Sequence, residues 1–124
     1  MRTSREQARN VAIAVLQAGT DHSAKGNPGM EANWALFSNL AHQAAQQKPD
    51  LIVFPEYAIT GWPYPSEQEI NGIAENIPGY GTWYMRYVDL AVKTCTPILG
   101  WMLETDEGHL YSTAILLDEH GKFI

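Results

Sequence analysis

The chain has 124 residues, 45% of them hydrophobic, which fits one globular domain with its own core and argues against disorder. Its 14 acidic residues outnumber its 8 basic ones, and the net charge of −6 disfavours nucleic acid and anionic membranes as partners. No apolar run approaches the ~20 residues that cross a bilayer, and the single cysteine, Cys95, fits a reducing compartment. We therefore expect a cytoplasmic protein.

The chain begins with a polar tail and a first strand. Residues 1–10 hold three arginines and precede an apolar run at 11–16. That run is shorter than the ~7–15 apolar residues of a secretory signal, so we interpret residues 1–10 as a tail and not as a leader. Residues 11–124 are then the domain, and residues 11–17 predict a buried strand.

A loop and a helix follow. Residues 18–29 contain three glycines and a proline and predict a loop. Over residues 30–47 the apolar side chains recur at helical spacing, with Trp34 and Phe37 on the same stripe. We expect this stripe to pack against the sheet, since a cofactor site is the less common use of such a pattern.

The stretch LIVFPE at residues 51–56 predicts a short strand buried on both faces and ended by Pro55. Proline cannot donate to a sheet ladder, and it holds Phe54 in an extended conformation. Glu56 therefore follows the carboxyl end of a strand, where open α/β sheets place their ligands, and partial burial there would suit a general base. The alternative is a solvated glutamate that begins a loop.

An aromatic loop follows Glu56. Residues 57–65 contain one glycine and two prolines together with Tyr57, Trp62 and Tyr64. These three rings either wall a substrate pocket beside Glu56 or only cover the edge of the sheet, and the pattern favours neither.

The second half predicts two helices and a hairpin. Ser66 and Glu69 resemble a capping box that opens a helix to about residue 76, and residues 84–95 are amphipathic. Strands at 97–104 and 111–117 are joined by a turn too short for a crossover helix, so they must be antiparallel. The expected fold class is α/β (α+β) with a mixed sheet, helices on one face and an opposite face that needs a cover.

Several short motifs recur in an order known from one superfamily. They are LIVFPE at 51–56, TG at 60–61, IPG at 77–79, the strand around Gly100, and LYSTA at 110–114. From about Val11 to the last residue the chain resembles the nitrilase, or carbon–nitrogen hydrolase, superfamily. The Phe-Pro-Glu step after a buried run is the most specific part of this resemblance.

The resemblance implies an α-β-β-α sandwich of which residues 11–124 are the N-terminal half. It implies a hydrolase, often an amidase of nitrogen compound metabolism, that attacks nonpeptide C–N bonds in nitriles, amides or carbamoyl-amines without a cofactor. A Glu-Lys-Cys triad does this chemistry through a thioester, and Glu56 matches its general base. Small-molecule substrates and homo-oligomers are implied for intact members. Because the four histidines are scattered, we expect no metal site.

The lysine and cysteine of the triad have no match here. Lys122 comes too early, and Cys95 ends a helix on its buried stripe, away from the helix N-terminus or cation that activates a thiol. We interpret Cys95 as structural. Ser112 stands where the family usually has Asn, a departure that bears on how Glu56 is held. Glu104 is either a second carboxylate near Glu56 or an exposed hairpin residue.

Two functional hypotheses follow. In the first, the chain is a fragment of a nitrilase-like hydrolase and is inactive alone. In the second, it is a non-catalytic remnant or a subunit that pairs with another chain through its exposed sheet face. A receiver-type signalling domain is disfavoured by the hairpin and by the lone Asp21 after the first strand.

Overall fold

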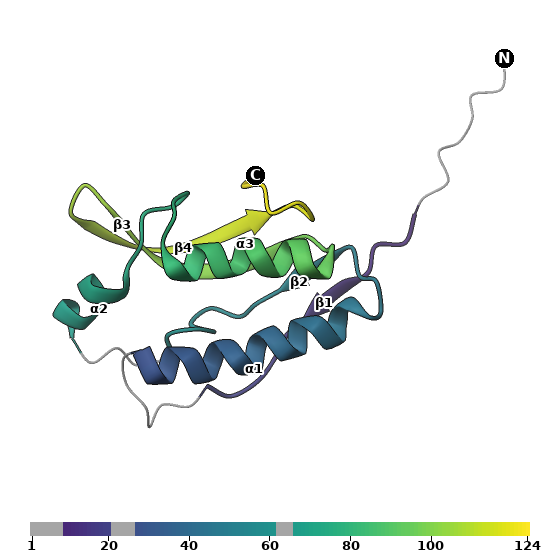
Figure 1. Ribbon diagram of the computed structural model, residues 1–124, viewed down its shortest axis with the longest axis horizontal. Helices are drawn as coiled ribbons and strands as arrows, with labels where there is room; N and C mark the ends of the chain where they lie inside the picture. The colour runs from purple at the N-terminus through teal and green to yellow at the C-terminus, as the bar shows by residue number, and fades with distance from the viewer. Residues whose placement is uncertain (1–8, 21–26, 62–65) are drawn as a thin grey trace, which may run out of the picture.

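Four strands form one mixed sheet in the computed structural model, which describes residues 9–20, 27–61 and 66–124 (Figure 1). The elements in chain order are β1 (Ile13–Val15), α1 (Asn27–Ala45), β2 (Leu51–Val53), α2 (Glu67–Ile73), α3 (Thr82–Thr94), β3 (Ile98–Asp106) and β4 (His109–Leu117). Strand order in space equals chain order; β1, β2 and β3 are parallel, and β4 is antiparallel to β3. The predicted β-α-β unit and antiparallel hairpin are both confirmed.

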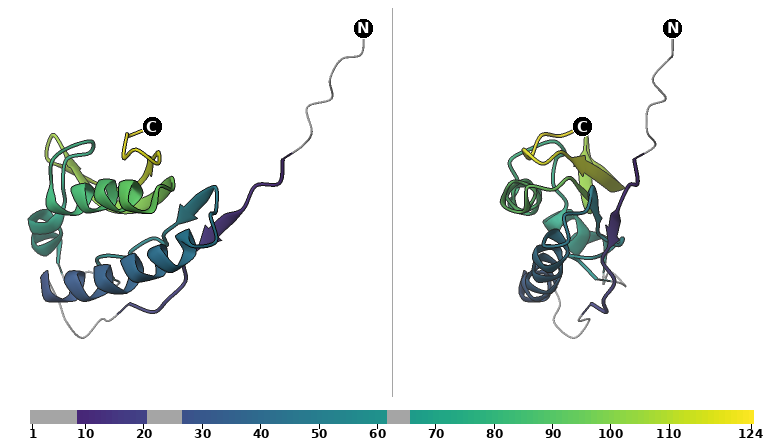
Figure 2. Two further views of the ribbon diagram at one scale, coloured as in Figure 1. Left: turned by 45° about the vertical axis from the view of Figure 1, so that its right-hand side comes forward. Right: turned by 90° about the vertical axis from the view of Figure 1, so that its right-hand side faces the viewer.

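The two long helices, α1 and α3, cover the same face of the sheet, and α2 lies beside the hairpin end of β3 (Figures 1 and 2). This arrangement confirms the predicted α/β class with a mixed sheet and one helical layer. Across the described parts of the chain, no helix combines the length and apolarity needed to cross a bilayer.

Four aromatic rings fill the space between the helices and the sheet. The Tyr87 ring of α3 meets Trp34 of α1 edge-on at 5.2 Å and Phe54 edge-on at 5.0 Å, and Phe37 lies 6.0 Å from Phe54. Phe37 and Tyr87 are completely buried. The predicted packing of the Trp34 and Phe37 stripe against the sheet is therefore confirmed.

Tyr87 reaches the sheet because Gly100 leaves room for it. A Cβ at Gly100 would lie 2.7 Å from Tyr87 Cε1, closer than two carbon atoms can approach. The Tyr87 hydroxyl donates to the carbonyl of Trp101 at 3.3 Å, so its polar atom is satisfied inside the core. Burial strongly raises the pKa of Tyr87, and the hydroxyl stays protonated.

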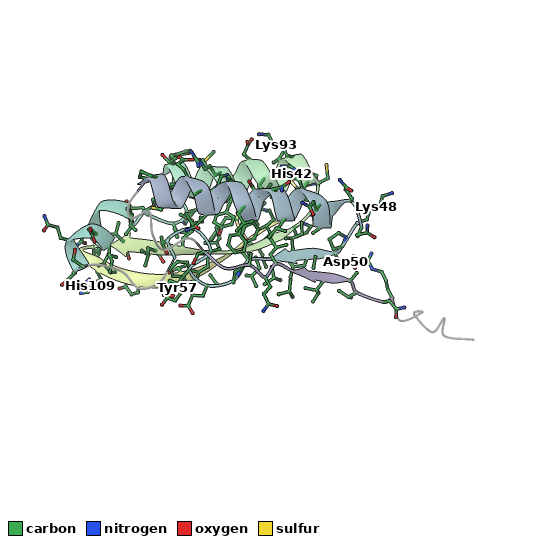
Figure 3. All side chains as sticks on the ribbon, turned by 90° about the horizontal axis from the view of Figure 1, so that it is seen from below. His42, Lys48, Asp50, Tyr57, Lys93 and His109 are labelled. Atoms are coloured by element: carbon green, nitrogen blue, oxygen red, sulfur yellow. The ribbon has the colours of Figure 1, made fainter. Side chains whose placement is uncertain are left out.

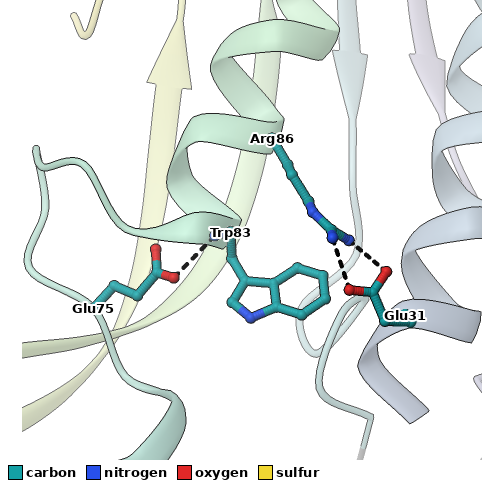
Figure 4. A network of polar contacts seen from close by, with 4 residues as sticks. All are labelled: Glu31, Glu75, Trp83 and Arg86. Carbon is teal, nitrogen blue, oxygen red and sulfur yellow. Dashed lines mark hydrogen bonds and ion pairs between the residues drawn. The ribbon is translucent and has the colours of Figure 1, made fainter. Parts of the chain in front are cut away.

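Polar contacts fix α3 at its N-terminus and join it to α1 (Figure 4). The Glu75 carboxylate accepts from the backbone N–H groups of Trp83 and Tyr84, both at 2.9 Å, which are donors that the first turn of a helix leaves without intrahelical partners. Arg86 donates twice to the carboxylate of Glu31 on α1, at 2.7 Å each. Its guanidinium also lies 4.4 Å from the centre of the Trp83 ring.

No helix covers the other face of the sheet among the residues that the structure describes, and this face is most exposed at β1 and toward the end of β4. On β1, Ile13 is 56% and Val15 69% exposed, and Leu116 on β4 is 39% exposed. Side chains alternate along a strand, so Ile115 and Leu117 are buried under the helices while Leu116 faces away from them. The need for a second cover was predicted correctly.

Burial of the first two strands on both faces was predicted wrongly. β1 is an edge strand with only its central residue partly buried, and in β2 Leu51 and Val53 are half-buried while Ile52 is completely buried. An apolar run tells only that a strand can be buried; whether anything lies on its second face depends on what else packs there.

Candidate active site

Glu56 follows β2 at the carboxyl end of the parallel strands. Ile52 and Phe54 make the last ladder bonds before it, Ile52 N–H to the Pro97 carbonyl and Phe54 N–H to the Leu99 carbonyl, both at 2.9 Å. Pro55 then interrupts the ladder, because it has no N–H to donate. The predicted position of the glutamate at the rim of the sheet agrees with the structure.

The loop after Glu56 is held by a buried amide. The Asn33 side chain of α1 is 2% exposed and donates from Nδ2 to the Ile59 carbonyl at 3.0 Å. Within the loop the Gly61 N–H donates to the Tyr57 carbonyl at 2.8 Å, and Tyr57 has a φ of 61° in the left-handed region. Non-glycine residues rarely adopt this conformation, so the surrounding contacts impose it.

A chain of two hydrogen bonds ends at Glu56. The Trp101 indole N–H donates to Ser112 Oγ at 2.7 Å, and the Ser112 hydroxyl donates to Glu56 Oε1 at 3.0 Å. Ser112 pairs with Leu103 across the hairpin, so by alternation its side chain shares a face with Trp101. That face is the one without helices. Glu56 is accordingly exposed, so the structure does not show the partial burial that would suit a general base.

Tyr57 lies beside Glu56. Its ring meets that of Trp101 edge-on with 4.5 Å between centroids. Desolvation raises the pKa of Tyr57, and a hydrogen bond to the Glu56 carboxylate and the charge of that carboxylate raise it further. Figure 3 shows Tyr57 on the side of the sheet opposite the helices, which carry His42 and Lys93. The other two predicted pocket residues, Trp62 and Tyr64, lie outside the described residues.

A hollow of about 470 Å³ opens next to this cluster. Tyr57 and Ser112 form one part of its wall, and Ile70 of α2 with Leu110 and Tyr111 of β4 form others. Two residues that contact Glu56 thus also line a space whose walls carry apolar groups, hydroxyl groups and the carboxylate of Glu67, the mixture of apolar surface and a few polar groups that small-molecule sites use.

The other polar candidates lie elsewhere. Glu104 accepts from Thr113 Oγ1 at 2.6 Å, and alternation places it on the face opposite to Leu103 and Ser112. It is therefore not a second carboxylate beside Glu56. Lys122 is exposed in the turn after β4, where its N–H donates to Asp118 Oδ1 at 2.8 Å.

Cys95 is exposed, and its expected place on the buried stripe is wrong. α3 ends at Thr94 and Cys95 has a φ of 47°, so its side chain leaves the helical stripe at that point. Since α3 leads by a short turn into the start of β3, Cys95 lies at the amino end of the parallel strands. Glu56 lies at their carboxyl end, the opposite edge of the sheet.

Within the described ranges, no group of three or more His, Cys, Asp or Glu side chains is arranged to hold a metal ion. The group that can do chemistry at this position is the carboxylate of Glu56, which can accept a proton and which receives hydrogen bonds from neighbouring hydroxyl groups. The sequence alone did not indicate that Trp101 contacts Ser112, the residue that donates to Glu56, or that Tyr111 lines the hollow. The register of the hairpin, if known, would have placed Trp101 and Ser112 on the same face.

Comparison with known proteins shows the family of the chain. A family model for carbon–nitrogen hydrolases matches residues 12–124, and the chain belongs to this family. A protein N-terminal amidase of Saccharomyces cerevisiae is 26% identical over 96 residues, which cover 77% of this chain and 21% of the amidase. A nitrilase of Pyrococcus abyssi is 29% identical over 92 residues, or 73% of this chain and 34% of the nitrilase. The chain therefore spans a fifth to a third of these relatives.

Solved structures share the fold. A crystal structure of an N-terminal amidase superposes with a TM-score of 0.71 at 21% identity, covering 92% of this chain and 26% of the amidase chain. A carbon–nitrogen hydrolase from Helicobacter pylori gives a TM-score of 0.74 at 19% identity, covering 91% of this chain and 37% of the other. At these identities the likeness establishes the fold, and the resemblance inferred from the motifs is confirmed by the family match.

Proposed function

We propose that this chain carries the general base, Glu56, of a hydrolase that cleaves nonpeptide C–N bonds in nitriles, amides or carbamoyl-amines. The observation that carries the proposal is the carboxylate of Glu56 at the carboxyl end of β2, hydrogen-bonded by Ser112 at 3.0 Å beside an open hollow. In a Glu-Lys-Cys mechanism this carboxylate takes the proton of the cysteine thiol. For an amide, the thiolate attacks the carbonyl carbon, and the lysine stabilises the tetrahedral intermediate. The carboxyl group returns the proton to the departing amine as the C–N bond breaks and the thioester forms, and water then cleaves the thioester to release the acid and the thiol.

Amides are the best supported substrate class. One similar solved structure is an amidase from a Nesterenkonia species in complex with butyramide, and the N-terminal amidase was solved with an Asn-Glu peptide. Tyr57, Ile70 and Leu110 give the hollow beside Glu56 apolar walls, which suits the carbon chain of a small amide. Tyr57 is thus a substrate-contacting residue in this proposal, and Trp62 and Tyr64 share that role.

We further propose that residues 11–124 are an incomplete domain behind a tail at residues 1–10 and that they do not catalyse hydrolysis by themselves. Glu56 has no thiol to activate, because Cys95 lies at the opposite edge of the sheet. Lys122 sits in an exposed turn and does not match the lysine of the triad. A lysine and a cysteine supplied from outside these residues are needed.

The purified chain tests this directly. Assayed with butyramide, an aliphatic nitrile and a carbamoyl-amine, it should give no turnover above buffer, and Cys95→Ala should change nothing. Turnover that disappears in Cys95→Ala would show that this thiol is the nucleophile and would contradict the proposal.

The role of Glu56 is tested in the protein encoded by the coding sequence that includes and continues past these residues. An in-frame continuation with a Tyr-x-Lys segment and one later cysteine would supply the other two members of the triad. There Glu56→Gln should lower kcat by roughly 10²–10⁴-fold, the usual contribution of a general base. The matched control Glu104→Gln, which alters a carboxylate on the other face of the hairpin, should leave kcat within a few fold. Equal effects of the two variants would refute a special role for Glu56.

The second candidate function is a non-catalytic subunit that binds another chain through the uncovered sheet face. The exposed side chains of Ile13, Val15 and Leu116 on that face favour it, because contiguous apolar patches of several hundred Å² usually mark interfaces. Leu116 on the uncovered sheet face and Leu36 in α1, which belongs to the helical layer, are 39% and 38% exposed and so form a matched pair for substitution.

Light scattering during size-exclusion chromatography separates the possibilities. If the sheet face pairs, the wild-type chain is larger than a monomer, Leu116→Lys shifts it toward the monomer, and Leu36→Lys does not. A wild-type monomer that binds no hydrophobic dye would contradict a role for this face in pairing.

A further inference from the structure

Trp101 is the residue on which the surroundings of Glu56 converge. It lies in β3 and is 6% exposed, although it belongs to the face of the sheet without helices. Its indole N–H contacts Ser112 of β4 at 2.7 Å, and its ring meets Tyr57 of the loop after β2 at 4.5 Å. Three separate segments of the chain thus meet on one buried side chain next to the carboxylate.

The direction of the Ser112 hydroxyl follows from donor and acceptor counting. An indole N–H can only donate, so Ser112 Oγ must accept from Trp101. A serine hydroxyl has a single proton. Because the oxygen accepts from the indole, the Ser112 proton is donated to Glu56 Oε1 at 3.0 Å. Hydrogen bonds to a carboxylate are stronger than neutral ones, so this contact favours one orientation of the glutamate.

Tyr57 gives the second contact to the same carboxylate. Its ring is held edge-on by Trp101, an arrangement that aromatic pairs prefer, and its backbone at a φ of 61° leaves little freedom to move away. A tyrosine hydroxyl is protonated at neutral pH and can donate, and desolvation and the hydrogen bond to Glu56 raise the pKa of Tyr57 further.

We propose that Trp101 is a positioning residue for Glu56, which it orients through the hydroxyl of Ser112 and by supporting the ring of Tyr57. The proposal rests on the proposed function of Glu56 as the base. An exposed glutamate would otherwise move among several rotamers, and a base has to be held within hydrogen-bond reach of the proton it removes. Glu56 is exposed, so burial does not restrict its side chain. The contacts that depend on Trp101 restrict it instead.

The rotamer of Glu56 can be measured in the 124-residue chain by NMR, through the three-bond couplings that report its χ1 angle. The wild type should give values of a single rotamer, and the Trp101 indole proton resonance should shift as Glu56 ionises. Ser112→Ala and Trp101→Phe should both move the couplings to rotamer-averaged values, and Ser112→Thr, which restores a hydroxyl, should return them. The Trp101 shift should vanish in Glu56→Gln and in Ser112→Ala.

Thr113→Val is the matched control, since it removes the neighbouring hydroxyl, which donates to Glu104 and not to Glu56. It should change neither the Glu56 couplings nor the Trp101 titration. Averaged couplings in the wild type, or unchanged couplings in Trp101→Phe or in Ser112→Ala, would overturn the proposal. Ser112 is exposed on its strand, so its variants should fold, and amide spectra verify this. The couplings do not depend on catalysis, so an inactive whole enzyme would refute the proposed function without affecting this result.

Discussion

The two faces of the sheet are built in opposite ways. Under α1 and α3, the rings of Phe37, Phe54 and Tyr87 interlock, and Phe37 and Tyr87 have no exposed surface. On the other face Val15 of β1 is 69% exposed, and Glu56 and Ser112 meet in the open. Stability therefore resides on the helical face, and the residues proposed for chemistry lie on the face that is free to contact something else.

The difference also explains how polar groups are treated. On the helical face the buried Tyr87 hydroxyl is paired within the core and stays protonated. On the open face hydroxyl groups are directed at a carboxylate that water can reach. Enclosed polar groups must be satisfied internally, whereas those of the open face remain available for a ligand.

The largest effect is expected from a pair of truncations, one on each face. Phe37→Ala leaves a cavity in the closed core and should lower the free energy of unfolding by about 3–5 kcal/mol. Val15→Ala removes atoms already in water and should cost less than about 0.5 kcal/mol. Urea unfolding of the two variants gives both values. A Val15→Ala cost close to that of Phe37→Ala would show that the open face is covered in solution.

Two glycines sharpen the comparison at an intermediate scale. Gly100→Ala puts a methyl group against the Tyr87 ring and should destabilise the chain by about 1–3 kcal/mol through overpacking. Gly72→Ala in α2, where a Cβ meets nothing within 4 Å, should be neutral or stabilising by about 0.5–1 kcal/mol. Thermal unfolding followed by circular dichroism compares them. A harmless Gly100→Ala would contradict the close contact between α3 and β3.

The smallest effect is a pH dependence at the turn after β4, where Gly121 packs on Val88 of α3. Hydrogen bonds from the backbone N–H of Lys122 and, less strongly, from that of His120 lower the pKa of Asp118, although some desolvation opposes them. Because the folded pKa is below the unfolded value of about 3.9, the stabilisation is complete above that pH and is lost as the pH falls through the folded pKa.

Asp118→Asn should therefore be less stable than wild type at neutral pH, and the gap should close in acid. Unfolding midpoints measured between neutral and acidic pH check this, with Asp106→Asn at the exposed hairpin end as a control for charge. A gap that stays constant with pH would mean that the turn does not depend on the ionised carboxylate.

Most of the helical face could be predicted from the sequence. The spacing of Trp34 and Phe37 predicted both the helix and its packing, and the short turn before β4 required an antiparallel pair, since both are local patterns. Ser66 was predicted to begin α2, and its Oγ accepts from the Glu69 N–H at 3.2 Å. The exposure of β1 was predicted wrongly. It depends on whether another element packs on the second face of the sheet, which the local sequence pattern does not reveal.

The site could be predicted only in part. Pro55 and the strand before it placed Glu56 correctly, and Ser112 was recognised as bearing on how Glu56 is held. The part played by Trp101 depends on which residues of β3 and β4 are paired, because a shift of one residue in this pairing would put Ser112 on the face opposite to Trp101. The pairing register is set by the turn of Glu107 and Gly108, both at positive φ.

Glu56 follows β2, whereas Ser112, which donates to it, lies in the β3–β4 hairpin. The two residues are therefore on opposite sides of the short β2–β3 pairing. β3 and β4 pair over nine positions, whereas β2 and β3 pair only at Ile52 with Ile98 and at Val53 with Leu99. Any breathing that parts β2 from β3 also pulls the carboxylate away from the hairpin. The amide proton of Phe54 is donated to the Leu99 carbonyl, across the pairing of β2 with β3. Its rate of exchange with solvent therefore reports how often Glu56 and Ser112 separate.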